Sequence, residues 1–129
     1  IYQNAFRMMG QDITTLEIPE LAGAIEFGVP AGEVEQIIRM AFAGASDFDV
    51  VILGCTHYPL MRDVFAKVLP GILVFDPAIA VAQRAQKFFW PQEVGEGQTN
   101  FILSRASEKF NGFVAKLFPG MRYELEVLK

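Results

Sequence analysis

The only cysteine and the only histidine of the 129-residue chain lie two positions apart, at Cys55 and His57. A thiolate can act as a nucleophile or a base, and a cationic or hydrogen-bonding imidazole beside it favours the thiolate form. A cysteine and a histidine at this spacing could therefore perform acid–base or covalent chemistry. A lone cysteine is, however, more often a small buried apolar residue. The spacing alone leaves both interpretations open.

The residues around this pair predict a strand before it and a helix after it. Residues 50–53 form a continuous apolar run rich in β-branched side chains, which is typical of a strand buried on both faces. The apolar spacing of residues 60–69 predicts a helix, with Pro59 at its first position. Cys55 would then lie at the carboxyl end of a strand, where open α/β sheets bind ligands. The following helix start would favour the thiolate and could hold a carboxylate.

Strands and helices alternate along the whole chain. Strands are predicted at 13–18, 50–53, 72–75, 101–103 and 123–127, and helices at 2–9, 34–42, 60–69, 78–88 and up to 117 after a cap at Ser104 or Ser107. Asp76 is predicted to cap the helix at 78–88, and residues 92–100 are the best linker candidate. The alternation predicts an α/β fold in which a parallel sheet is flanked by helices.

Composition limits the classes of partner and location. Hydrophobic residues make up 52% of the chain and charged residues 20%, as in a globular domain. The net charge of -4 argues against nucleic acid and anionic membranes as partners. A single cysteine cannot form an intrachain disulfide and fits a reducing cytoplasm. Because the sequence has neither metal-ligand spacings nor a long apolar run, we expect no metal, no cofactor and no membrane span.

Residues 53–60, Leu-Gly-Cys-Thr-His-Tyr-Pro-Leu, resemble the second cysteine signature of the glutamate racemases, in the aspartate/glutamate racemase superfamily. Residues 48–49 and 74–76 also resemble the family. Upstream, residues 18–21 and 25–28 are similar to a family stretch that reads roughly Cys-Pro-x-Leu and then Val-Glu-x-Gly, with Ile18 in place of the cysteine. A weaker similarity runs over residues 101–117. The resemblance covers most of the chain but only the second part of a racemase.

This resemblance implies a cofactor-independent racemase that interconverts L- and D-glutamate and supplies D-glutamate for peptidoglycan, hence for cell wall biogenesis and cell shape. Cys55 would be one of two thiol acid/bases and would take the proton from the L-enantiomer. His57 would support Cys55 by orienting it or favouring its thiolate. Thr56 would bind the substrate through its hydroxyl and backbone N–H, and Glu26 would lie near the substrate. A histidine after Thr56 favours glutamate over aspartate as the substrate.

The sequence also departs from the family. The racemases use two cysteines, whereas this chain has one, and their N-terminal Asp-Ser-Gly and Cys-Asn-Thr motifs have no counterpart here. We therefore expect a C-terminal fragment of an isomerase, inactive alone and associating into a homo-oligomer. Residues 1–80 would be most of a C-terminal domain and residues 81–129 a segment returning to the N-terminal domain. Three alternatives stay open: a non-catalytic module that pairs with another chain, a related aspartate- or hydantoin-type racemase, and a thiol-redox or hydrolytic site using Cys55 with His57.

Overall fold

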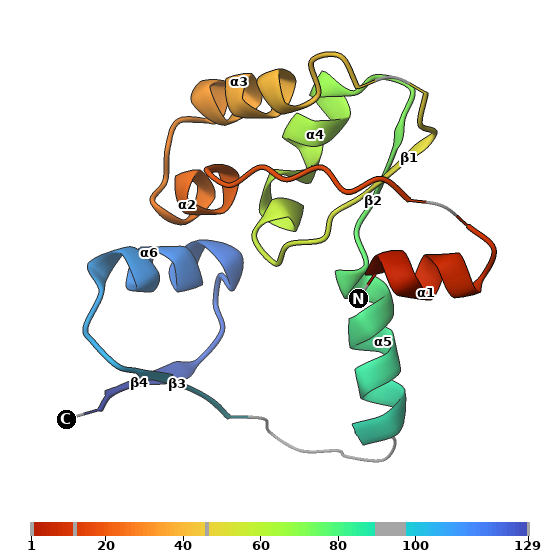
Figure 1. The fold of residues 1–129 in the computed structure, drawn as a ribbon. Helices are drawn as coiled ribbons and strands as arrows, with labels where there is room; N and C mark the ends of the chain where they lie inside the picture. Colours follow the sequence, from red (N-terminus) through yellow and green to blue (C-terminus); the bar gives the residue numbers. More distant parts are fainter. Residues whose placement is uncertain (1, 12, 46, 90–97, 129) are drawn as a thin grey trace. The chain divides into compact units, whose positions relative to one another are not determined.

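The computed structural model describes residues 2–11, 13–45, 47–89 and 98–128 (Figure 1). The chain divides into two compact units, Ile1–Ala85 and Gln86–Lys129, and each is described by itself. The assignment of residues 1–80 and 81–129 to two racemase domains stays a prediction. Within the described ranges, no helix is long and apolar enough to cross a lipid bilayer.

The described residues of the first unit form five helical segments and two short strands ahead of α5. Their bounds are α1 (Tyr2–Met8), α2 (Leu21–Glu26), α3 (Ala31–Ala41), β1 (Val50–Ile52), the 3-10 turn η1 (Tyr58–Met61), α4 (Arg62–Val68) and β2 (Leu73–Phe75). Helix α5 (Ala78–Phe89) contains the boundary between the units. The second unit continues with β3 (Thr99–Leu103), α6 (Glu108–Leu117) and β4 (Tyr123–Val127).

Both strand pairs are parallel. Strand β1 pairs with β2, with Val51 opposite Val74, and β3 pairs with β4, with Phe101 opposite Leu125. A parallel pair needs a crossover connection, which α4 with η1 provides in the first unit and α6 in the second. The predicted α/β fold with parallel strands and flanking helices is thus confirmed.

Two predicted helix caps are present. The Ser107 hydroxyl oxygen accepts a hydrogen bond of 3.1 Å from the backbone N–H of Phe110 at the start of α6. The Asp76 carboxylate accepts one of 2.9 Å from the N–H of Ala78, the first residue of α5. Each bond satisfies a backbone donor that has no partner inside its helix. Asp76 therefore has a structural role in this fold.

The core of the first unit joins α2, α3, α4 and the strand pair. Its buried side chains are Ile18, Leu21, Ile25, Val34, Ile38, Leu53, Phe65, Leu69 and Val74. Val34 and Ile38 are one helical turn apart, so α3 presents a single apolar stripe to this core. On the outside, the Glu35 carboxylate accepts hydrogen bonds from Lys67 of α4 and from Arg39 of α3, and these bonds lower the pKa of Glu35.

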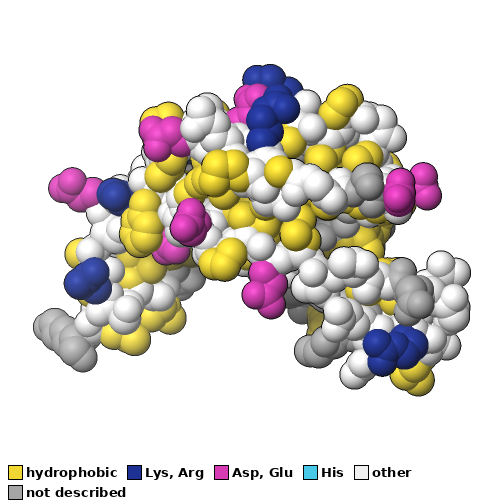
Figure 2. All heavy atoms as spheres, turned by 45° about the horizontal axis from the view of Figure 1, so that its top comes forward, with side chains coloured by type: hydrophobic (Ala, Val, Ile, Leu, Met, Phe, Trp, Pro, Cys, Tyr) yellow, Lys and Arg dark blue, Asp and Glu magenta, His cyan; other side chains and the backbone are white. Residues whose placement is uncertain are grey.

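The strands are less buried than the sequence predicts. Val50, Leu73 and Phe75 are 45%, 58% and 44% exposed, so the prediction that residues 50–53 are buried on both faces is wrong, and residues 72–75 are less buried than a core strand. The reason is that this sheet has two strands among the described residues, and buried side chains come mainly from one face. Figure 2 shows many hydrophobic side chains on the face that it presents.

The predicted strand at 13–18 is also wrong. Those residues form no strand, because a strand requires a neighbouring backbone to pair with and none of the described strands pairs with this segment. Only Ile18 of the segment is buried. Most of the predicted linker, residues 92–97, lies outside the described residues, and β3 already begins at Thr99.

Candidate active site

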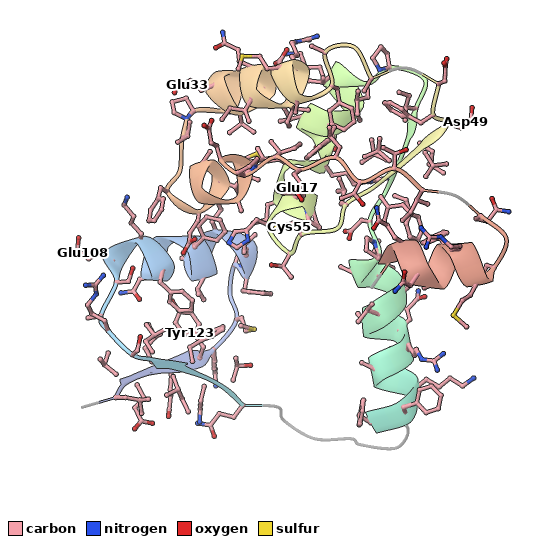
Figure 3. All side chains as sticks on the ribbon, in the orientation of Figure 1. Glu17, Glu33, Asp49, Cys55, Glu108 and Tyr123 are labelled. Carbon is pink, nitrogen blue, oxygen red and sulfur yellow. The ribbon has the colours of Figure 1, made fainter. Side chains whose placement is uncertain are left out.

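Cys55 lies in a tight turn at the carboxyl end of β1, where the sequence predicts it (Figure 3). The N–H of Leu53 donates to the carbonyl oxygen of Phe75 (3.0 Å), which continues the parallel pairing one residue beyond β1. The N–H of Tyr58 then donates to the carbonyl oxygen of Cys55 (3.2 Å) and closes the turn. The thiol is partly buried.

The helix after the turn starts differently from the prediction. The first helical segment is the 3-10 turn η1, in which the N–H of Leu60 donates to the carbonyl oxygen of His57 (3.1 Å), and α4 begins only at Arg62. Pro59 is the second residue of η1, where its missing N–H costs no hydrogen bond within the helical segment. A thiol beside such a short segment receives less help from the helix dipole than the sequence suggests.

The side chains of Cys55, His57 and Glu26 follow one another in a row, with His57 in the middle. The Cys55 Sγ lies 3.9 Å from His57 Nδ1, and the other ring nitrogen, Nε2, lies 3.8 Å from Glu26 Oε2. The first contact is within the range of hydrogen bonds to sulfur. The second is too long for a direct hydrogen bond but suits an ion pair once the imidazole is protonated. Glu26 is the last residue of α2, and α2 packs against η1, which explains how residues so far apart in sequence meet.

The side chains of Cys55, His57 and Glu26 could together transfer a proton. With the ring proton on Nε2, facing Glu26, the Nδ1 lone pair faces the thiol and can accept its proton. The resulting imidazolium would lie between a thiolate and a carboxylate, both of which stabilise its positive charge. The side chains of His57 and Glu26 are 35% and 62% exposed, so water weakens these attractions.

Tyr58 is a further residue of the site that the sequence reasoning missed. Its hydroxyl donates to the carbonyl oxygen of Ile18 (3.2 Å), and its ring lies 5.8 Å from that of Phe65. Burial, and then the nearby charge of Cys55, raise the pKa of Tyr58, so the phenol stays a donor. The available signal was its position directly after His57, in a motif where an aromatic side chain with a polar tip can link a loop to the core.

The remaining predicted site residue, Thr56, lies in the same turn with an exposed side chain. The structure thus brings Cys55, His57 and Glu26 into one row and leaves Thr56 on the surface beside them. Among the residues that the structure describes, no group of three or more His, Cys, Asp or Glu side chains is arranged to hold a metal ion.

Comparison with known proteins adds to this geometry. Glutamate racemase of Aquifex aeolicus (strain VF5) is 27% identical to this chain over 130 residues, which are 98% of this chain and 49% of that protein. The chain resembles the glutamate racemases. No family model matches it.

Solved structures of glutamate racemases share its fold. The crystal structure of a glutamate racemase isoform from Bacillus anthracis superposes with a TM-score of 0.80 at 20% identity, covering 99% of this chain and 52% of that one. The glutamate racemase from Francisella tularensis in complex with D-glutamate superposes with a TM-score of 0.72 at 20% identity, covering 87% and 45%. The chain therefore spans about half the length of the racemases that it matches.

Proposed function

We propose that this chain is the part of a glutamate racemase that carries Cys55 as one of two thiol acid/bases. The observation that supports the proposal best is the row Cys55–His57–Glu26 at the carboxyl end of β1, in a chain that resembles glutamate racemases. In this proposal His57 accepts the proton of the thiol, and Glu26 is the partner for the positive charge of the imidazolium. That arrangement suits acid–base work at a carbon atom.

The chemical problem is that the Cα–H group of an amino acid is a very weak acid. In the proposed step, the Cys55 thiolate takes the Cα proton of L-glutamate, so that the C–H bond breaks, the S–H bond forms, and the electron pair is delocalised into the α-carboxylate. Inversion is completed when an acid on the opposite face returns a proton to Cα. This chain holds one cysteine, so the second thiol would come from outside these 129 residues.

The other predicted residues receive roles within this proposal. His57 accepts the Cys55 proton and keeps the thiol ionised, and the exposed Thr56 binds the substrate through its hydroxyl and N–H. For Glu26, the contact with His57 Nε2 favours a role in orienting the imidazole at the edge of the substrate site. By the same resemblance, we assign the whole protein to the cytoplasm and to the supply of D-glutamate for peptidoglycan, without a cofactor.

The proposal predicts proton exchange at one face of the substrate. Incubation of the full 129-residue chain with L-glutamate in D₂O should introduce deuterium at Cα, because Cys55 can remove the proton, exchange it with solvent and return deuterium from the same face. Mass spectrometry or proton NMR of the recovered glutamate measures the exchange. D-glutamate, whose α-proton faces away from Cys55, should exchange much more slowly.

Measurement of net racemisation distinguishes proton exchange by Cys55 alone from complete conversion of L- to D-glutamate. Circular dichroism of the same samples should show L-glutamate persisting, because inversion requires a second acid opposite Cys55. Equal deuteration of both enantiomers would contradict a single base fixed on one face. Absence of any exchange above the buffer rate would count against the racemase proposal for this chain.

A second candidate function, a module that pairs with another chain, has its own support. Among the described residues, each strand pairs with one neighbour only, so both small sheets leave edges open. Large apolar side chains such as Leu73, Ile79 and Phe118 are also exposed. We therefore propose that the chain forms a homo-oligomer, which would cover this apolar surface.

Light scattering of the purified chain tests this association. We expect a mass of at least two chains at micromolar concentration, decreasing on dilution. A stable, dispersed monomer over the same range would contradict the homo-oligomer. That result would leave the proton-exchange experiment unaffected.

A further inference from the structure

Tyr58 makes hydrogen bonds through both its backbone and its side chain. Its N–H donates to the carbonyl oxygen of Cys55 at 3.2 Å, which closes the turn that carries the thiol and the imidazole. Its hydroxyl donates to the carbonyl oxygen of Ile18 at 3.2 Å, 40 residues earlier in the chain. One residue therefore connects the turn to a distant segment.

The Tyr58 hydroxyl is bonded to the segment that leads into α2. The Ile18 carbonyl oxygen also accepts a hydrogen bond of 3.2 Å from the N–H of Leu21, the first residue of α2. Ile18 itself is 9% exposed and belongs to the core cluster. Since Glu26 ends this six-residue helix, the Tyr58 hydroxyl is bonded three residues before the first residue of α2, while His57 lies 3.8 Å from its last residue.

The ring and the hydroxyl of Tyr58 have separable roles. The ring lies against Phe65, with centroids 5.8 Å apart and planes inclined by 40°, and it packs partly buried against the core. A phenylalanine could make the same contact. The hydroxyl adds only the directional bond to Ile18, and such a bond fixes distance and orientation as well as adding stability.

We propose that Tyr58 is a positioning residue whose hydroxyl, by tying the Cys55–His57 turn to the entrance of α2, sets the spacing of the imidazole between Cys55 and Glu26. Tyr58 does not contact the substrate in this proposal and acts through His57. Its catalytic meaning depends on the proposed racemase function. Its effect on the thiol can be measured without any substrate.

The test is the rate at which iodoacetamide alkylates Cys55 in the full chain, measured between pH 6 and 10 (roughly the range around an ordinary thiol titration). Four proteins are compared: the parent, Tyr58→Phe, His57→Asn and the double variant. Tyr58→Phe should slow alkylation at neutral pH by about 2- to 10-fold, the effect of one lost hydrogen bond. The rate curve should move to higher pH with the same plateau, because His57, between Cys55 and Glu26, no longer supports the thiolate.

The double variant shows whether Tyr58 acts through His57. In the His57→Asn background, adding Tyr58→Phe should change the rate by less than about 2-fold, because the group that it positions is already absent. Tyr123→Phe, which removes a tyrosine hydroxyl from the second unit, is the matched control and should leave the rate unchanged. Circular dichroism checks that each variant is folded.

Several results would overturn the inference. These are an unchanged rate in Tyr58→Phe, an equal loss in both backgrounds, a change in the plateau alone, or loss of the folded state in Tyr58→Phe. Failure of the racemase proposal can be distinguished from failure of this inference. In that case the parent would exchange no α-proton of L-glutamate, while the alkylation rates of the four proteins would still show the expected pattern. That combination would support the positioning role of Tyr58 and reject the racemase.

Discussion

Replacement of Cys55 by serine is expected to abolish the exchange of the α-proton of L-glutamate, with a loss of at least about 10²-fold, as for removal of a general base. A serine hydroxyl is ionised far less readily than a thiol, so it cannot remove a very weakly acidic proton at neutral pH. The change is small in volume, and the bond that closes the turn uses the backbone oxygen of Cys55. The turn should therefore survive the substitution.

Two controls make the result interpretable. Thermal unfolding of Cys55→Ser should match that of the parent, which would show that lost exchange is not lost folding. Alkylation of the parent chain should abolish exchange equally, because Cys55 is the only thiol present. If Cys55→Ser kept the parental exchange rate, Cys55 would have no part in the chemistry, and His57 would be the base to test next.

Local signals in the sequence were enough to predict several features of the fold. The run of β-branched residues before Cys55 predicts β1, and the Ser107 cap predicts the start of α6. Both depend on residues within a few positions of one another, where backbone preferences and short side-chain bonds decide the structure. The position of Cys55 at the end of a strand follows from the same local reasoning.

Features that depend on distant segments could not be predicted from local patterns, and Glu26 was expected near the substrate from the family resemblance alone. The hydroxyl of Tyr58 meets the carbonyl oxygen of Ile18, and the imidazole of His57 meets Glu26, only because α2 packs against η1. No periodicity within one segment reports such a contact. The exposure of Leu73 and Val50 was missed for the same reason, since burial of a strand depends on how many layers cover it and not on its own apolar run.

The core side chain Phe65 also packs against the site residue Tyr58. The ring of Phe65 is 1% exposed on α4 and lies 6.4 Å from Phe42 and 5.8 Å from Tyr58. It therefore contacts Tyr58, whose N–H closes the turn of Cys55, while it also belongs to the buried core of the first unit. Loss of the Phe65 ring should therefore change both the free energy of unfolding of the first unit and the alkylation rate of Cys55.

Substitution of Phe65 by alanine is expected to lower the free energy of unfolding of the first unit by about 3–5 kcal/mol, through lost apolar burial and the cavity left behind. Urea titration measures this, with the alkylation rate of Cys55 as a probe inside that unit. The matched control is Phe75→Ala, the same change in the first unit at a side chain that is 44% exposed, with an expected loss of about 1 kcal/mol or less. Equal losses in the two variants would show that the core is not centred on Phe65. A large loss in Phe65→Ala, with faster alkylation of Cys55 at low urea, would show that the turn of the thiol depends on this ring.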